Sequence, residues 1–430
     1  MTSRQKLKLV FLLCIWFTQP VFTQDLCDRT GISNGWMLSK TNSEVDRVTA
    51  AAAASNALYF RSDFAWSDVQ YEGSDTWNWS NVDRVVNSAL AQDLELIAIL
   101  DYFPPWANAQ SDTSFWSQFV YEAGLRYIPK GVTIWEMWNE PNITNFWDQP
   151  DVKDYVEKIL IPGSNAIRKA ASDLGTSVTV ISAGLAPAAT DGTNISQIDF
   201  FKGIYENGGK DYFDAAGQHP YCWPLDPSIE NPFNWFLKTE ELRQVMIEQG
   251  DLDKKIWGTE MGWPTHLGNN GVSKNQQAQF LSSAFSIWNA WDWTGPLIWY
   301  AYNDAGEDAT YSEDNFGLTD SDFNPKPALD SFLVVTANCG VLSNTNISES
   351  NTEQIRLYPN PSSDKLFLYT HVKSTTIEIY TAQGLLLNRY ENIARTTGLD
   401  ISSYRAGLYF AVFTVEGKRV QSIKFFKADK

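Results

Sequence analysis

Residues 30 to 335 alternate between short apolar runs and longer stretches with helical periodicity. The apolar runs are too continuous to leave one face in water, which is typical of parallel strands. They lie at 35–38, 57–64, 94–101, 132–138, 177–184, 212–219, 255–260 and 296–302. Helical stretches lie between them at 81–92, 151–173, 235–250 and 275–291. Eight such repeats in about 300 residues predict a (β/α)8 TIM barrel rather than an open sheet.

A different pattern follows Cys339. Residues 340–354 are polar and rich in Ser, Thr and Asn, which indicates a linker. Residues 355–430 contain β-rich runs of five to eight residues separated by turn signals such as "NPSSD" and "VEGK". This spacing predicts a small all-β, immunoglobulin-like sandwich of antiparallel strands.

The amino end has the features of an export signal. Residues 1–23 place three cations ahead of a short apolar run that Gln19 and Pro20 interrupt. This run is too short for a membrane anchor, so we expect a cleaved signal peptide and no membrane span in the mature chain. The barrel domain would then occupy 24–339.

Composition narrows the class of partner. The formal net charge is -18, which argues against nucleic acid because phosphate binding requires clustered Lys and Arg. The chain contains 18 Trp, 18 Tyr and 24 Phe, and such rings suit the apolar faces of sugars as well as protein cores. Its cysteines and three histidines are too dispersed to predict a metal site, and we expect no cofactor.

Two glutamates end predicted strands. Glu140 follows the fourth strand in "IWEMWNEPN" and Glu260 ends the seventh in "KIWGTE". The carboxyl ends of barrel strands meet at one mouth, so we expect the two carboxyl groups to face each other there. Facing carboxyl groups are the minimum equipment for glycoside cleavage. The alternative is that each is a solvated acid at the start of a helix or loop.

Several motifs resemble those of clan A glycoside hydrolases. "WEMWNEPN" is similar to their acid/base motif and "WGTEMGWPT" to their nucleophile strand. "YFRSDFAWSDVQ", "ILDYFPPWA" and "HPY" follow the same order. Within the clan, the resemblance is nearest to family 39 and then to family 5. It covers residues 55 to 335.

The resemblance implies that Glu140 is the acid/base and Glu260 the nucleophile of a retaining hydrolase, with their carboxyl groups about 5 Å apart. Asn139 would bind the sugar 2-hydroxyl, and Arg61 and Tyr221 would keep Glu260 ionised. Trp299 resembles the platform under the reacting sugar. Four further residues are candidates for substrate contacts: His219, Asp101, Trp66 and Trp106. For each of these aromatic or polar residues, a purely structural role is the alternative.

The tail resembles a known sorting domain. "LYPNPSSDKLFL", "IEIYTAQGLLL" and "LDISSYRAGLYFAVF" are similar to the type A carboxy-terminal domain of the type IX secretion system of Bacteroidetes. This implies that the secretion machinery is a partner and that the protein is secreted or bound at the surface of a Gram-negative cell. A carbohydrate-binding sandwich is the alternative.

The substrate would be a poly- or oligosaccharide, but other activities fit the same residues. A transglycosylase would pass the sugar to another sugar, and a non-catalytic barrel would only bind it. We also predict a disulfide between Cys27 and Cys339, because they bracket the barrel and a closed barrel brings its ends together. Cys222 should then be a free, buried thiol.

Overall fold

The computed structural model describes residues 29–108 and 111–336, together with the carboxy-terminal segments 356–358, 365–369, 375–381, 385–393, 396–405, 407–415 and 418–427. The predicted signal peptide, the linker at 340–354 and both cysteines of the predicted disulfide, Cys27 and Cys339, lie outside these residues. Among the described residues, no helix combines the length and the apolar character that crossing a membrane requires.

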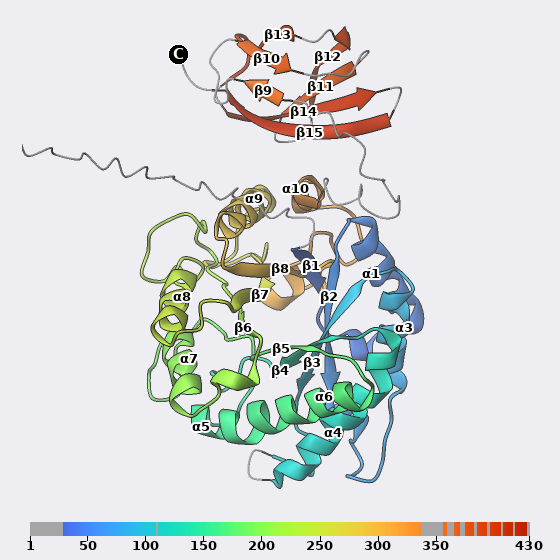
Figure 1. Ribbon diagram of the computed structural model, residues 1–430, viewed down its shortest axis with the longest axis vertical. Helices are drawn as coiled ribbons and strands as arrows, with labels where there is room; N and C mark the ends of the chain where they lie inside the picture. The colour runs from blue at the N-terminus through green and yellow to red at the C-terminus, as the bar shows by residue number, and fades with distance from the viewer. Residues whose placement is uncertain are drawn as a thin grey trace, which may run out of the picture.

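Eight parallel strands form a closed barrel (Figure 1). They are β1 (Thr30–Ser33), β2 (Tyr59–Ala65), β3 (Glu95–Asp101), β4 (Ile134–Met137), β5 (Thr179–Ile181), β6 (Ala215–Gln218), β7 (Lys255–Met261) and β8 (Thr294–Tyr300). Each strand pairs with the next one in the chain, and β1 pairs with β8 to close the barrel. The predicted TIM barrel is confirmed, and all strands end at the same mouth.

The prediction for the first strand was wrong, because β1 lies at Thr30–Ser33 and not at 35–38. Residues 35–38 lead into the short helix η2 (Met37–Ser39) instead. A Cβ atom at Gly31 would lie 2.7 Å from Cβ and 2.8 Å from the carbonyl oxygen of Tyr59 on the paired strand, so the barrel requires glycine there. Glycine has a low strand propensity, which explains why the pattern of this strand is weak.

Helices surround the barrel (Figure 1). They are α1 (Asn42–Ala54), α2 (Trp66–Val69), α3 (Ser80–Leu90), α4 (Thr113–Tyr127), α5 (Val152–Tyr155), α6 (Ile161–Asp173), α7 (Gln197–Glu206), α8 (Thr239–Glu248), α9 (Lys274–Ala290) and α10 (Pro327–Thr336). The helix predicted at 151–173 contains a π-helical turn at Val156–Leu160, just before Pro162. Proline lacks the N–H that a regular α-helix needs, which accounts for the irregular turn.

The carboxy-terminal strands form two antiparallel sheets. One contains β9 (Arg356–Tyr358), β10 (Lys365–Tyr369) and β13 (Thr396–Asp400), and the other contains β11 (Thr375–Thr381), β12 (Leu386–Ile393), β14 (Gly407–Val415) and β15 (Lys418–Lys427). Apolar side chains from both sheets share one buried cluster, which includes Leu366, Ile377, Leu399, Phe413 and Phe425. Two sheets around one core make a sandwich, as predicted.

Candidate active site

Glu140 and Glu260 lie at the mouth of the barrel. Glu260 is in the last part of β7, and Glu140 follows β4 after Asn139, which bridges to Gly184. A carboxylate oxygen of Glu140 lies within 4.8 Å of one of Glu260. Glu140 has a φ of 47°, a left-handed conformation that residues with a Cβ rarely adopt. Such strained residues cluster at functional sites, where surrounding contacts hold them in place.

Arg61 on β2 is completely buried and connects the polar groups of the site. Its Nε donates to Oε2 of Glu136 at 2.7 Å, and Nη1 donates to Oε1 of Glu260. Its Nη2 donates to Oδ1 of Asn139 at 3.0 Å. The other oxygen of Glu136 accepts from the Thr259 hydroxyl at 2.8 Å. The planar fork of a guanidinium is suited to fixing several acceptors at once.

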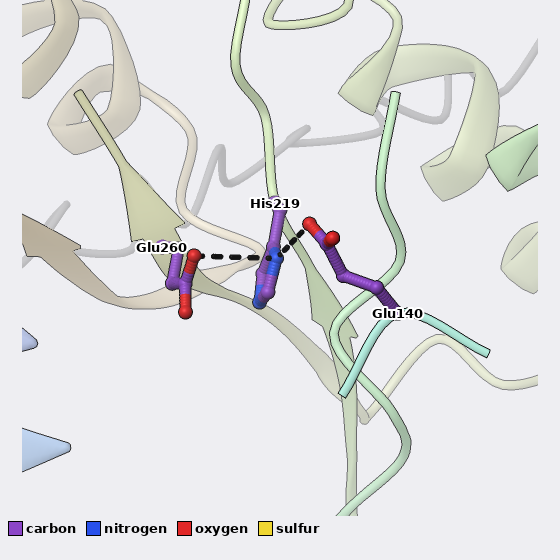
Figure 2. A group of neighbouring side chains, drawn as sticks. All are labelled: Glu140, His219 and Glu260. Atoms are coloured by element: carbon purple, nitrogen blue, oxygen red, sulfur yellow. Dashed lines mark hydrogen bonds and ion pairs between the residues drawn. The ribbon is translucent and has the colours of Figure 1, made fainter. Parts of the chain in front are cut away.

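His219 lies between the two glutamates (Figure 2). Its Nδ1 is 2.7 Å from Oε1 of Glu140 and 3.6 Å from Oε2 of Glu260. Its Nε2 is 3.3 Å from Nη2 of Arg61. Because a guanidinium nitrogen can only donate, Nε2 accepts and Nδ1 carries the hydrogen. Burial lowers the pKa of His219, so the neutral ring donates to Glu140.

Burial raises the pKa of both glutamates, but their partners differ. The charge of Arg61 and the Tyr221 hydroxyl, which donates to Oε2 of Glu260 at 2.9 Å, oppose this rise at Glu260. The partner of Glu140 is the neutral ring of His219. Because donors to a carboxylate favour its charged form, Glu260 is the more readily ionised of the two. Glu140 is better placed to hold a proton.

A cavity of about 1020 Å³ opens over these groups. Its polar lining includes Arg61, Asn139, Glu140, Tyr221 and Glu260. Its aromatic lining includes Trp36, Tyr102, Phe146, Trp223, Phe233, Trp235, Tyr300, Tyr311 and Phe316. Trp36 and Phe233 are 68% and 75% exposed, which is unusual for side chains of this size. Flat apolar rings beside polar groups suit the two kinds of surface that a sugar presents.

Trp299 does not line this cavity, which corrects the expectation that it forms the sugar platform. Its side chain is fully buried, and its ring stacks on that of Trp263 at a centroid distance of 6.0 Å. The next residue, Tyr300, lines the cavity and donates to Glu313 at 3.4 Å. Side chains alternate along a strand, so a shift of one residue exchanges the inner and outer positions.

Trp66 and Trp106 also lie away from the cavity lining, which corrects the expectation of a sugar contact at each. Their rings meet edge-on at a centroid distance of 5.5 Å. The indole of Trp66 donates to the Gln70 side chain at 2.7 Å, and that of Trp106 donates to the Gln70 carbonyl at 2.6 Å. These contacts give both residues a packing role.

His219 and Asp101 reach the cavity through a neighbour. Both are fully buried, and neither is part of the lining. His219 acts on Glu140, as described above, and Asp101 hydrogen-bonds to Asp63, which does line the cavity. Both residues are therefore placed to position other groups rather than to touch a ligand.

Glu136 is a residue of the site that the sequence pattern did not single out. It lies within β4 and is fully buried between Arg61 and Thr259. An acid inside an apolar strand was the available signal, because a buried charge needs a partner. Tyr300 and Glu313 were missed as well, and their role depends on the strand register and a loop contact that the sequence does not reveal.

Glu140, His219 and Glu260 together offer ligand atoms that lie within 4.8 Å of one another. A nitrogen and carboxylate oxygens at this spacing could hold a divalent cation. However, the guanidinium of Arg61 already bonds to Glu260 and contacts the His219 ring. This fixed positive charge would repel a cation, so the arrangement favours acid–base chemistry.

Residues 356–427 match the secretion system C-terminal sorting domain family. The match confirms the expectation for the tail and favours it over a carbohydrate-binding sandwich. The chain is thus directed to secretion, or to the cell surface, in the manner of Bacteroidetes. No curated protein matches the chain significantly.

Solved structures share the fold of the chain. A family 39 glycoside hydrolase from Bacteroides cellulosilyticus WH2 is 17% identical, with a TM-score of 0.57 over 87% of this chain and 80% of that chain. A glucosidase from Croceicoccus marinus is 12% identical, with a TM-score of 0.62 over 87% and 93%. The GH5_18 enzyme from Streptomyces cattleya is 14% identical, with a TM-score of 0.55 over 74% and 81%. Families 39 and 5 are those that the motifs resemble, and at these identities the likeness establishes the fold.

Proposed function

We propose that the chain is a secreted glycoside hydrolase that cleaves an O-glycosidic bond of a poly- or oligosaccharide with retention of configuration. The spacing of Glu140 and Glu260 carries the proposal, because their nearest carboxylate oxygens lie within 4.8 Å. Retaining enzymes have carboxyl groups about 5–5.5 Å apart, whereas inverting enzymes need about 6.5–9.5 Å to admit a water molecule. The short distance supports attack by one carboxylate on the sugar itself.

In the first step, Glu260 attacks the anomeric carbon and Glu140 donates its proton to the departing oxygen. The bond to the leaving group breaks as the bond to Glu260 forms. Arg61 and Tyr221 support this role, because they favour the ionised form of Glu260. Glu140 is 8% exposed, and its burial favours the protonated form that an acid requires.

In the second step, Glu140 accepts a proton from water, and the resulting hydroxide oxygen displaces Glu260 from the anomeric carbon. The His219 N–H to Glu140 stabilises its charge between the two steps. Asn139 has its carbonyl oxygen fixed by Arg61, which leaves its amide N–H groups directed to other partners. They would donate to the sugar 2-hydroxyl, a contact that strengthens in the transition state.

The experiment starts with a screen of the secreted chain against neutral and acidic polysaccharides, read by newly formed reducing ends. With the best substrate sugar, NMR records the anomer that forms first. Glu260→Ala should lose turnover by at least about 10⁴-fold on every substrate. Glu140→Ala should keep the first step for an activated aryl leaving group, and azide should then rescue the second.

The matched control is Glu206→Gln, which changes an exposed acid on α7 far along the chain from both catalytic positions. This variant should retain wild-type turnover. An inverted first product would refute the double displacement. If Glu140→Ala and Glu260→Ala respond alike to azide and to the leaving group, the two roles are assigned wrongly. Products that appear only after an acceptor sugar is added would identify a transglycosylase.

A further inference from the structure

The charged lining of the cavity is almost entirely acidic. Its charged members are Arg61, Asp63, Glu140, Glu260 and Glu313. Arg61 is the only cation among these described lining residues, and it is fully buried. Its three nitrogens already contact four protein groups, those of Glu136, Glu260, Asn139 and His219. The described lining therefore offers no free cation to a negatively charged ligand.

Asp63 is the lining acid next to the catalytic pair. It lies on β2 two residues after Arg61, on the same face of the strand, and Arg61 contacts Glu260 directly. Asp63 is half-buried, and the charge of Glu260 raises its pKa. Asp63 pairs in register with Ile99 on β3, so its side chain lies beside that of Asp101, two residues further along the same face of β3. Asp101 is fully buried, and the two carboxyl groups share a hydrogen bond. Two carboxyl groups can form such a bond only if one of them carries a proton.

Asp101 is the partner that carries the proton. Neither of its oxygens has a donor among the described residues, whereas Asp63 lies near the Arg61 charge. Burial, together with the charge of Asp63, raises the pKa of Asp101 well above its ordinary value. The pKa of Asp63 rises only to about 6, again chiefly through burial. Asp101 thus donates its hydrogen to Asp63 and holds that carboxylate in place.

The fixed carboxylate of Asp63 attracts some ligand groups and repels others. It accepts hydrogen bonds from sugar hydroxyl groups, and it repels a carboxylate or sulfate on the same sugar. Because Asp63 lines the cavity on the same face of β2 as Arg61, which contacts Glu260, the sugar that it meets is the one that becomes attached to Glu260. That sugar is the glycone, the part of the substrate retained by the enzyme in the first step.

We propose that Asp63, hydrogen-bonded to the buried Asp101, makes the cavity select glycones that carry no negative charge. The selected class is neutral sugars, and the excluded class is uronic acids and sulfated sugars. This inference rests on the proposed function, since it assigns the glycone of the same site. Asp63 is a specificity-determining residue, and Asp101 positions it.

The experiment uses the full secreted chain and pairs of 4-nitrophenyl glycosides that differ only at C6, with a hydroxymethyl group in one member and a carboxylate in the other. Gluco- and galacto-configured pairs in both anomers are compared by kcat/KM, and binding of the same compounds is followed by tryptophan fluorescence. We expect the neutral member to be preferred by at least about 10-fold. Asp63→Asn should lower kcat/KM for the neutral member by about 10- to 100-fold and lower the preference by about 10-fold.

Two variants of Asp101 separate positioning from a general loss of structure. Asp101→Asn keeps an N–H donor beside Asp63 and should preserve the neutral-to-anionic ratio, whereas Asp101→Leu removes the donor and should lower it. Equal loss of the ratio in both variants would overturn the role of Asp101. Equal or tighter binding of the anionic member by the wild type, or binding of neither member, would overturn the selectivity. Selective binding of the neutral member without cleavage would contradict the proposed hydrolase activity but not the proposed selectivity.

Discussion

A carboxyl group buried in a barrel must be neutral, or its charge must be stabilised by a cation or by several donors. Arg61 is the cation that stabilises Glu136 and Glu260, and it makes a direct contact with each. Asp101 has no comparable cation contact among the described residues and is kept neutral instead. The site thus contains acids in two states that are set by burial and by distance from one guanidinium.

The free energy of unfolding should depend on pH, because Asp101 is neutral in the folded protein. The pKa values of Asp63 and Asp101 are raised from an ordinary value of 3.8, to about 6 for Asp63 and well above the ordinary value for Asp101. A raised carboxyl pKa stabilises the folded state fully below the ordinary value, and this contribution is lost as the pH rises through the folded-state value. The wild type should therefore lose free energy of unfolding as the pH rises from about 4 to about 8.

Asp101→Asn should show a smaller loss over the same range, because its amide does not titrate. Urea unfolding of the wild type and the variant at several pH values in this range measures the difference. The urea midpoint of the variant, relative to that of the wild type, should increase as the pH rises. Parallel curves would show that Asp101 is ionised in the folded protein.

The sequence allowed Glu140 and Glu260 to be proposed because each ends an apolar run whose position in the barrel follows from counting strands. Their partners could not be derived in the same way. The contacts of Glu136 and Tyr300 depend on strand register, and a shift of one residue turned the expected Trp299 into Tyr300. The predicted sugar contacts of Trp66 and Trp106 were wrong, because amino-acid composition does not show whether an aromatic side chain near the mouth packs inward or faces the cavity.

At the scale of elements, the link between β4 and its loop contains two residues with a left-handed backbone. Trp138 and Glu140 have φ values of 84° and 47°, on either side of Asn139. The pattern of apolar residues located this strand end well, because the run "IWEM" is unambiguous. It could not reveal the left-handed backbone of Trp138 and Glu140. It also missed β1, where close packing requires Gly31.

Replacing Glu140 should expose this strain. Glu140→Gly removes the Cβ that disfavours a φ of 47°, whereas Glu140→Ala keeps it. Both variants lose the same carboxyl group and the same His219 contact. Glu140→Gly should therefore be more stable than Glu140→Ala by about 1 kcal/mol. Denaturant unfolding compares them, and a less stable glycine variant would show that the backbone is relaxed at this position.

At the scale of the whole molecule, the eight-stranded barrel and the sandwich, with seven strands among its described residues, serve separate purposes. The barrel holds the cavity, and the sandwich region matches a sorting domain for secretion. Both were predictable from the sequence, because strand spacing and turn signals differ between them. The domain boundaries at 24–339 and 355–430 remain predictions.

Secretion makes a disulfide between Cys27 and Cys339 possible, and this pairing also remains a prediction. A loop of this length should stabilise the folded chain by about 6 kcal/mol in the chain-entropy model, before any strain in the folded state is subtracted. Cys222 is free and buried, as expected. Maleimide labelling of the unfolded mature chain should modify one thiol before reduction and three afterwards. Three thiols without reduction would exclude the bond.

The central claim is that Glu260 becomes covalently attached to the sugar. An activated 2-deoxy-2-fluoro glycoside of the preferred sugar should trap this intermediate, because the fluorine slows both steps and the activated leaving group restores the rate of the first step only. Peptide mass spectrometry of the inactivated enzyme should find one fluorosugar, attached to Glu260. A label on Glu140 or on another acid, or continued turnover of the probe with inversion, would contradict the account.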